Sequence, residues 1–449
     1  MRPRLFLWAG LIVFAAVAAI LTYGVTRAQG PSEPPKVLPA EVLAPTPIGP
    51  TTKGVVPATA SAPATRKAAP FDRFRKYDEL PELTREIVFS AQRGMEWLAR
   101  DGIHQPNGRF VPGINPALGK PTEDDHFIRQ ALGAFALARA ARLNGDEKYA
   151  VRASHTILSL LAETPRDPGD PSLRKPVHQP VICNPVGAAS YLALAIYELP
   201  DVAPEMLQAG DELCQFLRGY LQTDGSVRFT EPDMPAEPGG VNLYPGPALA
   251  AIAMSNRSSP APWKKEALAR GMAYYRKHFQ SNPHPGLVPW MTVAFAEMHL
   301  QTRDRAYAEF VFEMTDWLRK LQYQNPERQR ALWRGGFPAV ADGKVLQTAP
   351  TIDSAYYALG FADACRMIRQ MDRADPARYD DYRAALARVL QFVTTLQYGE
   401  ENTTHFAAHF RPYLLGAFHP SHADGTLRVD HTAVAVAALS QYLIAGADR

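Results

Sequence analysis

The sequence predicts an all-α fold, an (α/α)6-type toroid of about six helical hairpins, preceded by a transmembrane helix and a proline-rich linker. Three observations predict this organisation. An uncharged segment lies near the N-terminus, a proline-rich segment follows it, and from residue 71 onward pairs of amphipathic and alanine-rich helices recur. Hydrophobic residues make up 46% of the chain and charged residues 21%, so a large core can be buried.

Residues 1–29 are expected to form a membrane anchor or signal. Arg2 and Arg4 precede an uncharged run over residues 5–25, and Arg27 follows shortly after it. A run of this length can cross a bilayer as a helix, and the positive residues before it favour a cytoplasmic N-terminus. A cleaved signal peptide is the alternative, although its apolar region is usually only about 7–15 residues long. Both interpretations place the main domain outside the cytoplasm, periplasmic or extracellular, and the first makes the membrane a partner.

Residues 30–70 are expected to be a disordered tether. Ten prolines fall between Pro31 and Pro70, among small residues and almost no aromatic ones. Such a segment cannot bury enough apolar surface to fold, and its prolines keep it extended. The folded domain is therefore expected over residues 71–449.

The helical pattern of this domain repeats. Amphipathic helices are centred near Trp97, Ile157, Phe216, Tyr275, Trp317 and Phe392, at successive spacings of 60, 59, 59, 42 and 75 residues. Repeats of this period, each too small to bury its own apolar face, are typical of stacked supersecondary units.

Each repeat has an internal order. In three of them a glycine turn with an aromatic residue follows the amphipathic helix, as in residues 107–110, 224–229 and 335–337. A second helix, rich in alanine, comes next. These second helices are expected over residues 131–141, 188–197, 248–254, 291–300, 355–367 and 432–443. A helix that is apolar nearly all round is a buried one, so the second helices should form an inner layer.

The hairpin period and the helix-turn-glycine-aromatic motif resemble those of the α/α-toroid superfamily over residues 80–445. This superfamily includes six-hairpin glycosidases, uronate epimerases and lyases, and terpenoid cyclases. The resemblance implies a toroid, without identifying a family within the class. The acidic motif of the cyclases has its nearest counterpart at residues 122–125, where Thr122 stands in place of the leading aspartate.

Long loops connect the outer to the inner helices, and polar residues follow them. The loops cover residues 101–122, 222–244, 323–351 and 398–428. Binding and catalytic residues concentrate on long loops of a rigid scaffold. Because the inner helices are parallel, their N-termini should converge on one ring of polar side chains. The expected catalytic residues are Asp124, Asp125, Asp353 and Asp430, with the first two facing the others across the ring. The expected substrate-binding residues are Glu123, His126, Arg129, Tyr244, Trp290, Trp333, Arg334, Tyr356, Tyr357 and His431.

Helix capping is the competing interpretation of the aspartates. Aspartate and asparagine are preferred N-caps, so Asp353 and Asp430 could serve only their own helices. The cluster over residues 123–126 exceeds what a cap needs. A loop with His405, His409, His419 and His422 is a second, weaker candidate for the functional site.

Composition excludes several functions. A formal net charge of +3 with thinly spread Lys and Arg offers no basic stripe for nucleic acid. Cys183, Cys214 and Cys365 have no CxxC spacing and lie apart from clustered histidines, so no metal site and no cofactor is expected. We interpret all three as buried apolar residues, and leave open whether Cys183 and Cys214 pair.

Three functions remain. The leading hypothesis is a carbohydrate-active enzyme that acts on a cell-envelope or exopolysaccharide glycan as a hydrolase, lyase or epimerase. Acid/base work on a sugar needs two titratable groups on opposite sides of it. A non-catalytic scaffold that binds a glycan or a protein is the alternative, and an isoprenoid or terpenoid-cyclase-like enzyme is the third. A polar lining of the toroid would separate the first two from the last.

Overall fold

The computed structural model describes residues 70–448, apart from residues 75, 123–124, 178–182, 232–233, 236, 342 and 374. The expected membrane helix and nearly all of the tether therefore lie outside the described residues. Within the described part of the chain, none of the helices has the length and apolar character needed to cross a membrane.

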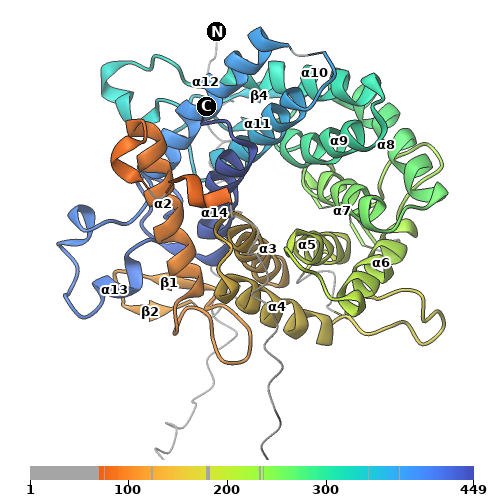
Figure 1. Cartoon of the computed structure of the whole chain (residues 1–449), viewed down its shortest axis with the longest axis horizontal. Coiled ribbons are helices and arrows are strands. Elements are labelled where there is room, and N and C mark those ends of the chain that lie inside the picture. Colours follow the sequence, from red (N-terminus) through yellow and green to blue (C-terminus); the bar gives the residue numbers. More distant parts are fainter. Residues whose placement is uncertain are drawn as a thin grey trace, which may run out of the picture. The chain divides into compact units, whose positions relative to one another are not determined.

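Twelve long helices of the described chain form two concentric layers (Figure 1). The outer helices are α2 (Glu82–Ala99), α4 (Glu147–Ala162), α6 (Pro204–Arg218), α8 (Pro262–Ser281), α10 (Arg305–Leu321) and α12 (Pro376–Thr394). The inner helices are α3 (Phe127–Asn144), α5 (Pro185–Glu198), α7 (Pro245–Ser258), α9 (Val288–Thr302), α11 (Ser354–Arg369) and α14 (Val429–Ala445). Each outer helix precedes its inner partner in the chain, as the sequence predicts.

The inner helices form a closed ring. Each one packs on the next in chain order, and α14 packs back on α3. Every residue of α5 is buried, whereas α10 buries only the stripe that carries Tyr307, Phe310, Val311, Met314 and Leu318. This difference follows from position, because an inner helix is covered on all sides and an outer helix on one. The predicted toroid of six hairpins is confirmed.

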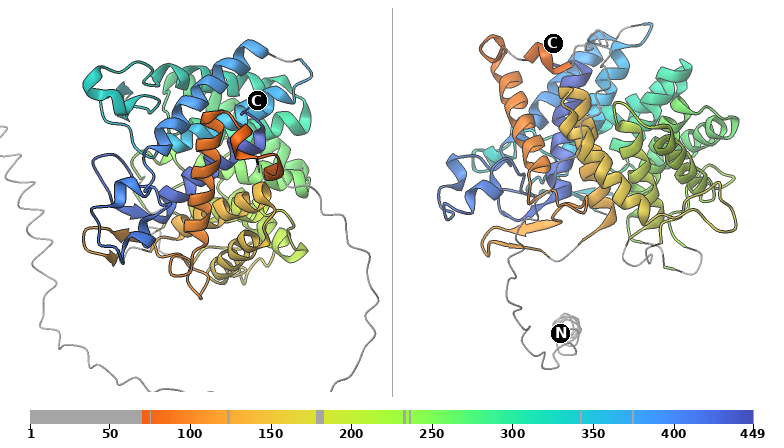
Figure 2. Two further views of the ribbon diagram at one scale, coloured as in Figure 1. Left: turned by 60° about the vertical axis from the view of Figure 1, so that its left-hand side comes forward. Right: turned by 60° about the horizontal axis from the view of Figure 1, so that its bottom comes forward.

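Short elements complete the described structure. The five 3-10 helices are η1 (Pro70–Phe74), η2 (Tyr77–Glu79), η3 (Gly240–Asn242), η4 (Arg328–Trp333) and η5 (Glu401–Thr403), and a four-residue helix, α13, covers Arg411–Leu414. Strands β1 (Gly113–Asn115), β2 (Lys120–Pro121) and β5 (Leu427–Arg428) form an antiparallel sheet in the order β2-β1-β5, and β3 (Val340–Ala341) pairs with β4 (Lys344–Val345). The three-stranded sheet joins the first long loop to the last, and Figure 2 shows these loops side by side at one end of the domain.

The glycine turns have a packing function. Gly108, Gly225 and Gly335 each follow an outer helix, have positive φ, and lie against the backbone of the next outer helix. A Cβ at Gly225 would lie 2.3 Å from the carbonyl oxygen of Arg270 on α8. Gly416 repeats this contact with Arg93 on α2, so the last turn packs on the first hairpin and closes the circle.

This fourth turn was not predicted, because an insertion hides it. In the first turn, Gln105 N–H donates to Arg109 O, and Gly108 N–H donates to Gln105 O. The last turn makes the same two hydrogen bonds between Tyr398, Gly416 and Ala417, but residues 399–415 now separate the two sides. The insertion extends a turn that is complete without it.

The end of the ring opposite the long loops is closed by buried charges. Arg139 of α3 donates to Glu198 of α5 at 3.0 Å, and Arg366 of α11 donates to Glu297 of α9 at 3.2 Å. These side chains lie near the C-terminal ends of inner helices around a void of only about 60 Å³. The toroid is therefore open to ligands from the looped end.

The three cysteines are buried and unpaired, as their interpretation as apolar core residues predicts. The outer-helix aromatics also pack inward. Trp97, Phe216, Tyr275 and Phe392 are buried, and Trp317 is half-buried against the core.

Candidate functional site

A cavity of about 560 Å³ lies at the looped end, where the inner helices begin. All six inner helices, or the residues directly before them, contribute to it. Its lining includes Ile128, Tyr191, Tyr244, Pro289, Trp290, Asp353, Tyr356, Tyr357, Arg428, Asp430, His431 and Val434. Seven of these residues were predicted as site residues, so the expected convergence of helix N-termini is what the structure shows.

Asp430 is held by two arginines. Nε of Arg428 donates to its Oδ1 at 3.0 Å, Nη2 of Arg428 donates to its Oδ2, and Nε of Arg129 lies 3.9 Å from Oδ1. Burial alone would raise the pKa of Asp430, but the hydrogen bonds from Arg428 and the positive charges around it lower the pKa below its usual range. Asp430 is therefore an anion at neutral pH.

Asp353 has a different environment. It directly precedes α11, yet its side chain makes no capping hydrogen bond, and its Oδ2 accepts from the hydroxyl of Thr351 at 3.1 Å. The capping interpretation is wrong for Asp353, and also for Asp430, which pairs with Arg428 instead of capping α14. Both carboxylates line the cavity, and neither caps its own helix.

Two histidines lie beside Asp430. Burial lowers the pKa of His431 and that of His126, in both cases against the opposing effect of Asp430. Nδ1 of each ring is buried and has no hydrogen-bond partner within the described chain. His431 lines the cavity and His126 occupies the N-cap position of α3. At neutral pH both imidazoles are uncharged and can accept a proton.

Aromatic side chains form the rest of the wall. Burial raises the pKa values of Tyr356, Tyr357 and Tyr244, so their phenols stay protonated and can donate hydrogen bonds. The hydroxyl of Tyr244 donates to Glu237 at 2.6 Å. Trp290 is buried, packs edge-on against Tyr191 at 5.4 Å between ring centroids, and also lines the cavity. Trp290 therefore packs in the core and also lines the cavity, and its predicted contact with a substrate stays a prediction.

Only part of the predicted acidic cluster before α3 lies within the described residues. Glu123 and Asp124 lie outside the described residues. Asp125 is exposed, and its Oδ1 accepts from the backbone N–H of His126 and from Gln130 at 2.8 Å each. Asp125 does not lie across the ring from Asp430, because α3 and α14 are neighbours in the ring and Arg129 of α3 lies 3.9 Å from Asp430.

Trp333 and Arg334 lie away from the cavity. Trp333 ends η4, with its ring 5.4 Å from that of Tyr323 and the guanidinium of Arg330 4.9 Å above it. Arg334 is exposed in the following turn. Neither residue is among those that line the cavity, so their predicted substrate-binding role would need a ligand that extends beyond it.

Several lining residues escaped the prediction. Arg428 ends the last long loop and could have been found as a cation two residues before Asp430. Tyr191 lies inside the alanine-rich α5, and His284 lies in the short loop before α9. Nothing in their sequence surroundings distinguishes these two from core or loop residues.

The fold and the site define an α/α toroid with a polar cavity at its looped end. No family model and no curated protein matches the sequence. Solved structures match over most of their length. The chain is similar to the unsaturated glucuronyl hydrolase of Bacillus sp. GL1, at 14% identity and a TM-score of 0.55 over 79% of this chain and 96% of that one.

Two further similar structures are an α-1,6-mannanase and an epimerase. The mannanase of Salegentibacter sp. HEL1_6 matches with 10% identity and a TM-score of 0.57 over 80% of this chain and 99% of that one. The cellobiose 2-epimerase of Spirochaeta thermophila matches with 14% identity and a TM-score of 0.55 over 81% and 97%. All are six-hairpin α/α toroids, which confirms the resemblance read from the repeats.

Proposed function

We propose that this protein is a carbohydrate-active enzyme that uses acid/base chemistry on a glycan bound in the cavity, outside the cytoplasm. The observation that carries the proposal is the joint presence of Asp353, Asp430, His431 and Tyr356 in one cavity at the mouth of the toroid. The lining contains carboxylates, a guanidinium and an imidazole, which suit a polar ligand and argue against an isoprenoid.

The surroundings of the two aspartates suggest different roles. Asp430 is fixed as an anion by Arg428 and holds that guanidinium in the cavity wall. Asp353 is exposed, and no described arginine forms a salt bridge with it. Asp353 is therefore the better candidate for transferring a proton to a glycosidic oxygen or at a sugar carbon, while neutral His431, on the neighbouring inner helix α14, can accept a proton.

The similar structures support this chemistry. They are two glycan hydrolases and a sugar epimerase, and the mannanase was solved in an inactive form in which two consecutive aspartates are replaced by asparagine, with α-1,6-mannotriose bound. This chain carries consecutive aspartates, Asp124 and Asp125, and His126 separates them in sequence from the start of inner helix α3. We retain Asp124 as a further candidate catalytic residue and assign Asp125 to the positioning of Gln130.

The first test is Asp353→Asn in an assay of the full-length chain against a panel of oligosaccharides, with products detected by mass spectrometry. We expect activity to fall by roughly 10²–10⁴-fold with an unchanged melting temperature. Asp372→Asn is the matched control, because Asp372 is an exposed aspartate just beyond the other end of α11. Full activity of Asp353→Asn would remove the assigned role. Binding that weakens in a protein without turnover would favour the non-catalytic scaffold.

A further inference from the structure

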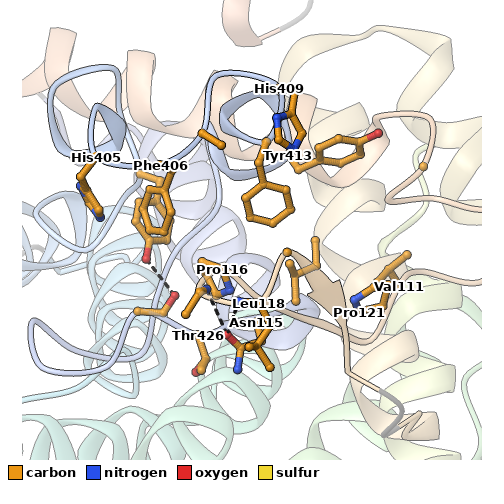
Figure 3. A pocket seen from close by; sticks show the side chains of 18 residues that line it. Val111, Asn115, Pro116, Leu118, Pro121, His405, Phe406, His409, Tyr413 and Thr426 are labelled. Carbon is orange, nitrogen blue, oxygen red and sulfur yellow. Dashed lines mark hydrogen bonds between the residues drawn. The ribbon is translucent and has the colours of Figure 1, made fainter.

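A second, larger concavity of about 1200 Å³ lies beside the cavity at the looped end. Figure 3 shows its two walls. One belongs to the first long loop, with Leu118 and the β1 strand, and the other to the last long loop, with Phe406, His409 and Tyr413. We call this concavity the loop groove.

The aromatic wall of the loop groove comes from the insertion in the fourth glycine turn. The backbone hydrogen bonds of that turn join Tyr398 to Gly416 and Ala417, and residues 399–415 extend outward from them. The equivalent turn at Gln222 and Gly225 spans only two intervening residues and still packs on the next outer helix. The packing of Gly416 on α2 therefore does not require the insertion. The structural effect of the insertion is to form one wall of the loop groove.

Both walls of the loop groove expose apolar surface to solvent. Tyr413 is 46% exposed, and Leu118 on the opposite wall is 69% exposed, whereas Phe406 and Phe410 are half-buried. The rings of Phe410 and Tyr413 are nearly parallel, at 27° and 5.9 Å between centroids, and His405 lies 4.0 Å from Phe406. Aromatic faces of this kind bind the C–H faces of sugar rings, while exposed histidines at their edges can bond hydroxyl groups.

The charge of the loop groove narrows the choice of occupant. None of the described residues that line it is an aspartate, glutamate, lysine or arginine. A highly charged ligand such as a nucleic acid or a phosphorylated peptide would find no counter-charge there. A neutral, hydroxyl-rich chain fits both the aromatic faces and the lack of formal charge.

The small sheet connects the lining of the loop groove with that of the cavity along the chain. Thr426 lines the groove, and Arg428, two residues further along, lines the cavity. Strand β5 between them pairs with β1, with Ile114 opposite Leu427, and Ile114 lines the groove. The two sites are therefore near enough along the sheet for one linear ligand to be tested against both.

We propose that the loop groove is a distal binding site for a neutral oligosaccharide chain, one part of which occupies the cavity. The inference rests on the proposed function and deepens it, because it specifies the glycan as a chain of several uncharged sugar units.

The test compares chain lengths by isothermal titration of the full-length protein with α-1,6-manno- and cello-oligosaccharides of two and six units. The groove variant is His409→Ala with Tyr413→Ala, two exposed side chains, and Phe89→Ala on α2 is a control for loss of an exposed aromatic ring elsewhere. We expect the wild type to bind a hexasaccharide more tightly than its disaccharide. The groove variant should lose about 3- to 10-fold in hexasaccharide affinity, with disaccharide affinity unchanged.

The outcomes separate this inference from the proposed function. Equal affinity of the wild type for both lengths, or an unaffected groove variant, overturns the distal site while turnover in the cavity can stand. Groove-dependent binding without any turnover supports the distal site and overturns the enzyme. A wild type that binds neither series overturns the distal site for neutral glycans. Binding of a synthetic peptide of residues 31–69 in the groove, with no glycan bound, would replace the glycan by the chain's own proline-rich segment.

A second variant tests the loop groove independently, in case the first variant misfolds locally. It replaces residues 399–415 by the Thr-Asp pair that fills the equivalent turn at residues 223–224. This change removes the backbone oxygen of Tyr413 that accepts from Nε1 of Trp97, so its melting temperature must be measured alongside. A folded excision variant that keeps the full hexasaccharide affinity would overturn the proposal.

Discussion

Two carboxylates at the starts of neighbouring inner helices differ in what they can do. Asp430 is buried and receives two hydrogen bonds from Arg428, whereas Asp353 is exposed and receives one from Thr351. An ion pair fixes the charge of the first, so its proton affinity is low. The two aspartates differ because the residue two positions earlier is an arginine in one case and a threonine in the other, and because Arg129 of α3 also lies 3.9 Å from Asp430.

The residues of the site were partly predictable. Helix starts after long loops identified Asp353, Tyr356, Asp430 and His431, because parallel inner helices must bring their N-termini together. Tyr191 could not be found this way. It lies in the middle of the alanine-rich helix α5, away from the helix start, and yet its side chain lines the cavity.

His104 provides a pH-dependent prediction at the same scale. It is 1% exposed, its Nε2 lies 3.0 Å from the Thr156 hydroxyl, and burial together with the charges of Arg152 and His155 lowers its pKa to about 4. In the unfolded chain the pKa is about 6.5. Below pH 6.5 the unfolded state therefore binds a proton that the folded state does not, and stability falls as the pH is lowered toward 4.

The measurement is the free energy of unfolding of wild type and His104→Gln between pH 7 and pH 4. We expect the wild type to lose of order 3 kcal/mol more than the variant over this range, because Gln does not titrate. Parallel pH profiles would show that His104 is not responsible.

At the scale of elements, the glycine turn is the unit that repeats. The turns at Gly108 and Gly225 were evident in the sequence because few residues separate each glycine from the end of its outer helix. The turn at Gly335 lies further from α10 but was evident from its Gly-Gly-Phe motif. The fourth, Gly416 to Phe418, was hidden by residues 399–415. A local motif search fails there because the two halves of the turn meet only in the folded chain.

Gly225→Ala tests the packing role of this turn. Gly225 has a φ of +93°, and a Cβ there would meet the backbone of Arg270. Gly239 is the matched control, since its φ is +75° and a Cβ there would meet nothing within 4 Å. Both substitutions should cost about 1–2 kcal/mol from backbone strain, and Gly225→Ala should cost about 1–3 kcal/mol more from overpacking. Denaturant unfolding checks this, and equal losses would mean that the close approach to α8 is unimportant.

At the scale of the whole molecule, the toroid follows from the repeat period and from the contrast between helices buried on one side and on all sides. The closure of α14 on α3 is a consequence of six such hairpins. The chemistry does not follow, because similar toroids at 10–14% identity include hydrolases and an epimerase.

The most direct test of the central claim is a crystal structure of the Asp353→Asn variant soaked with neutral and acidic oligosaccharides. We predict a sugar ring in the cavity, in contact with Trp290 and within hydrogen-bonding distance of residue 353, with further units in the loop groove for a neutral chain. A cavity that stays empty of sugar in every soak, or that takes up an apolar ligand instead, would contradict the account.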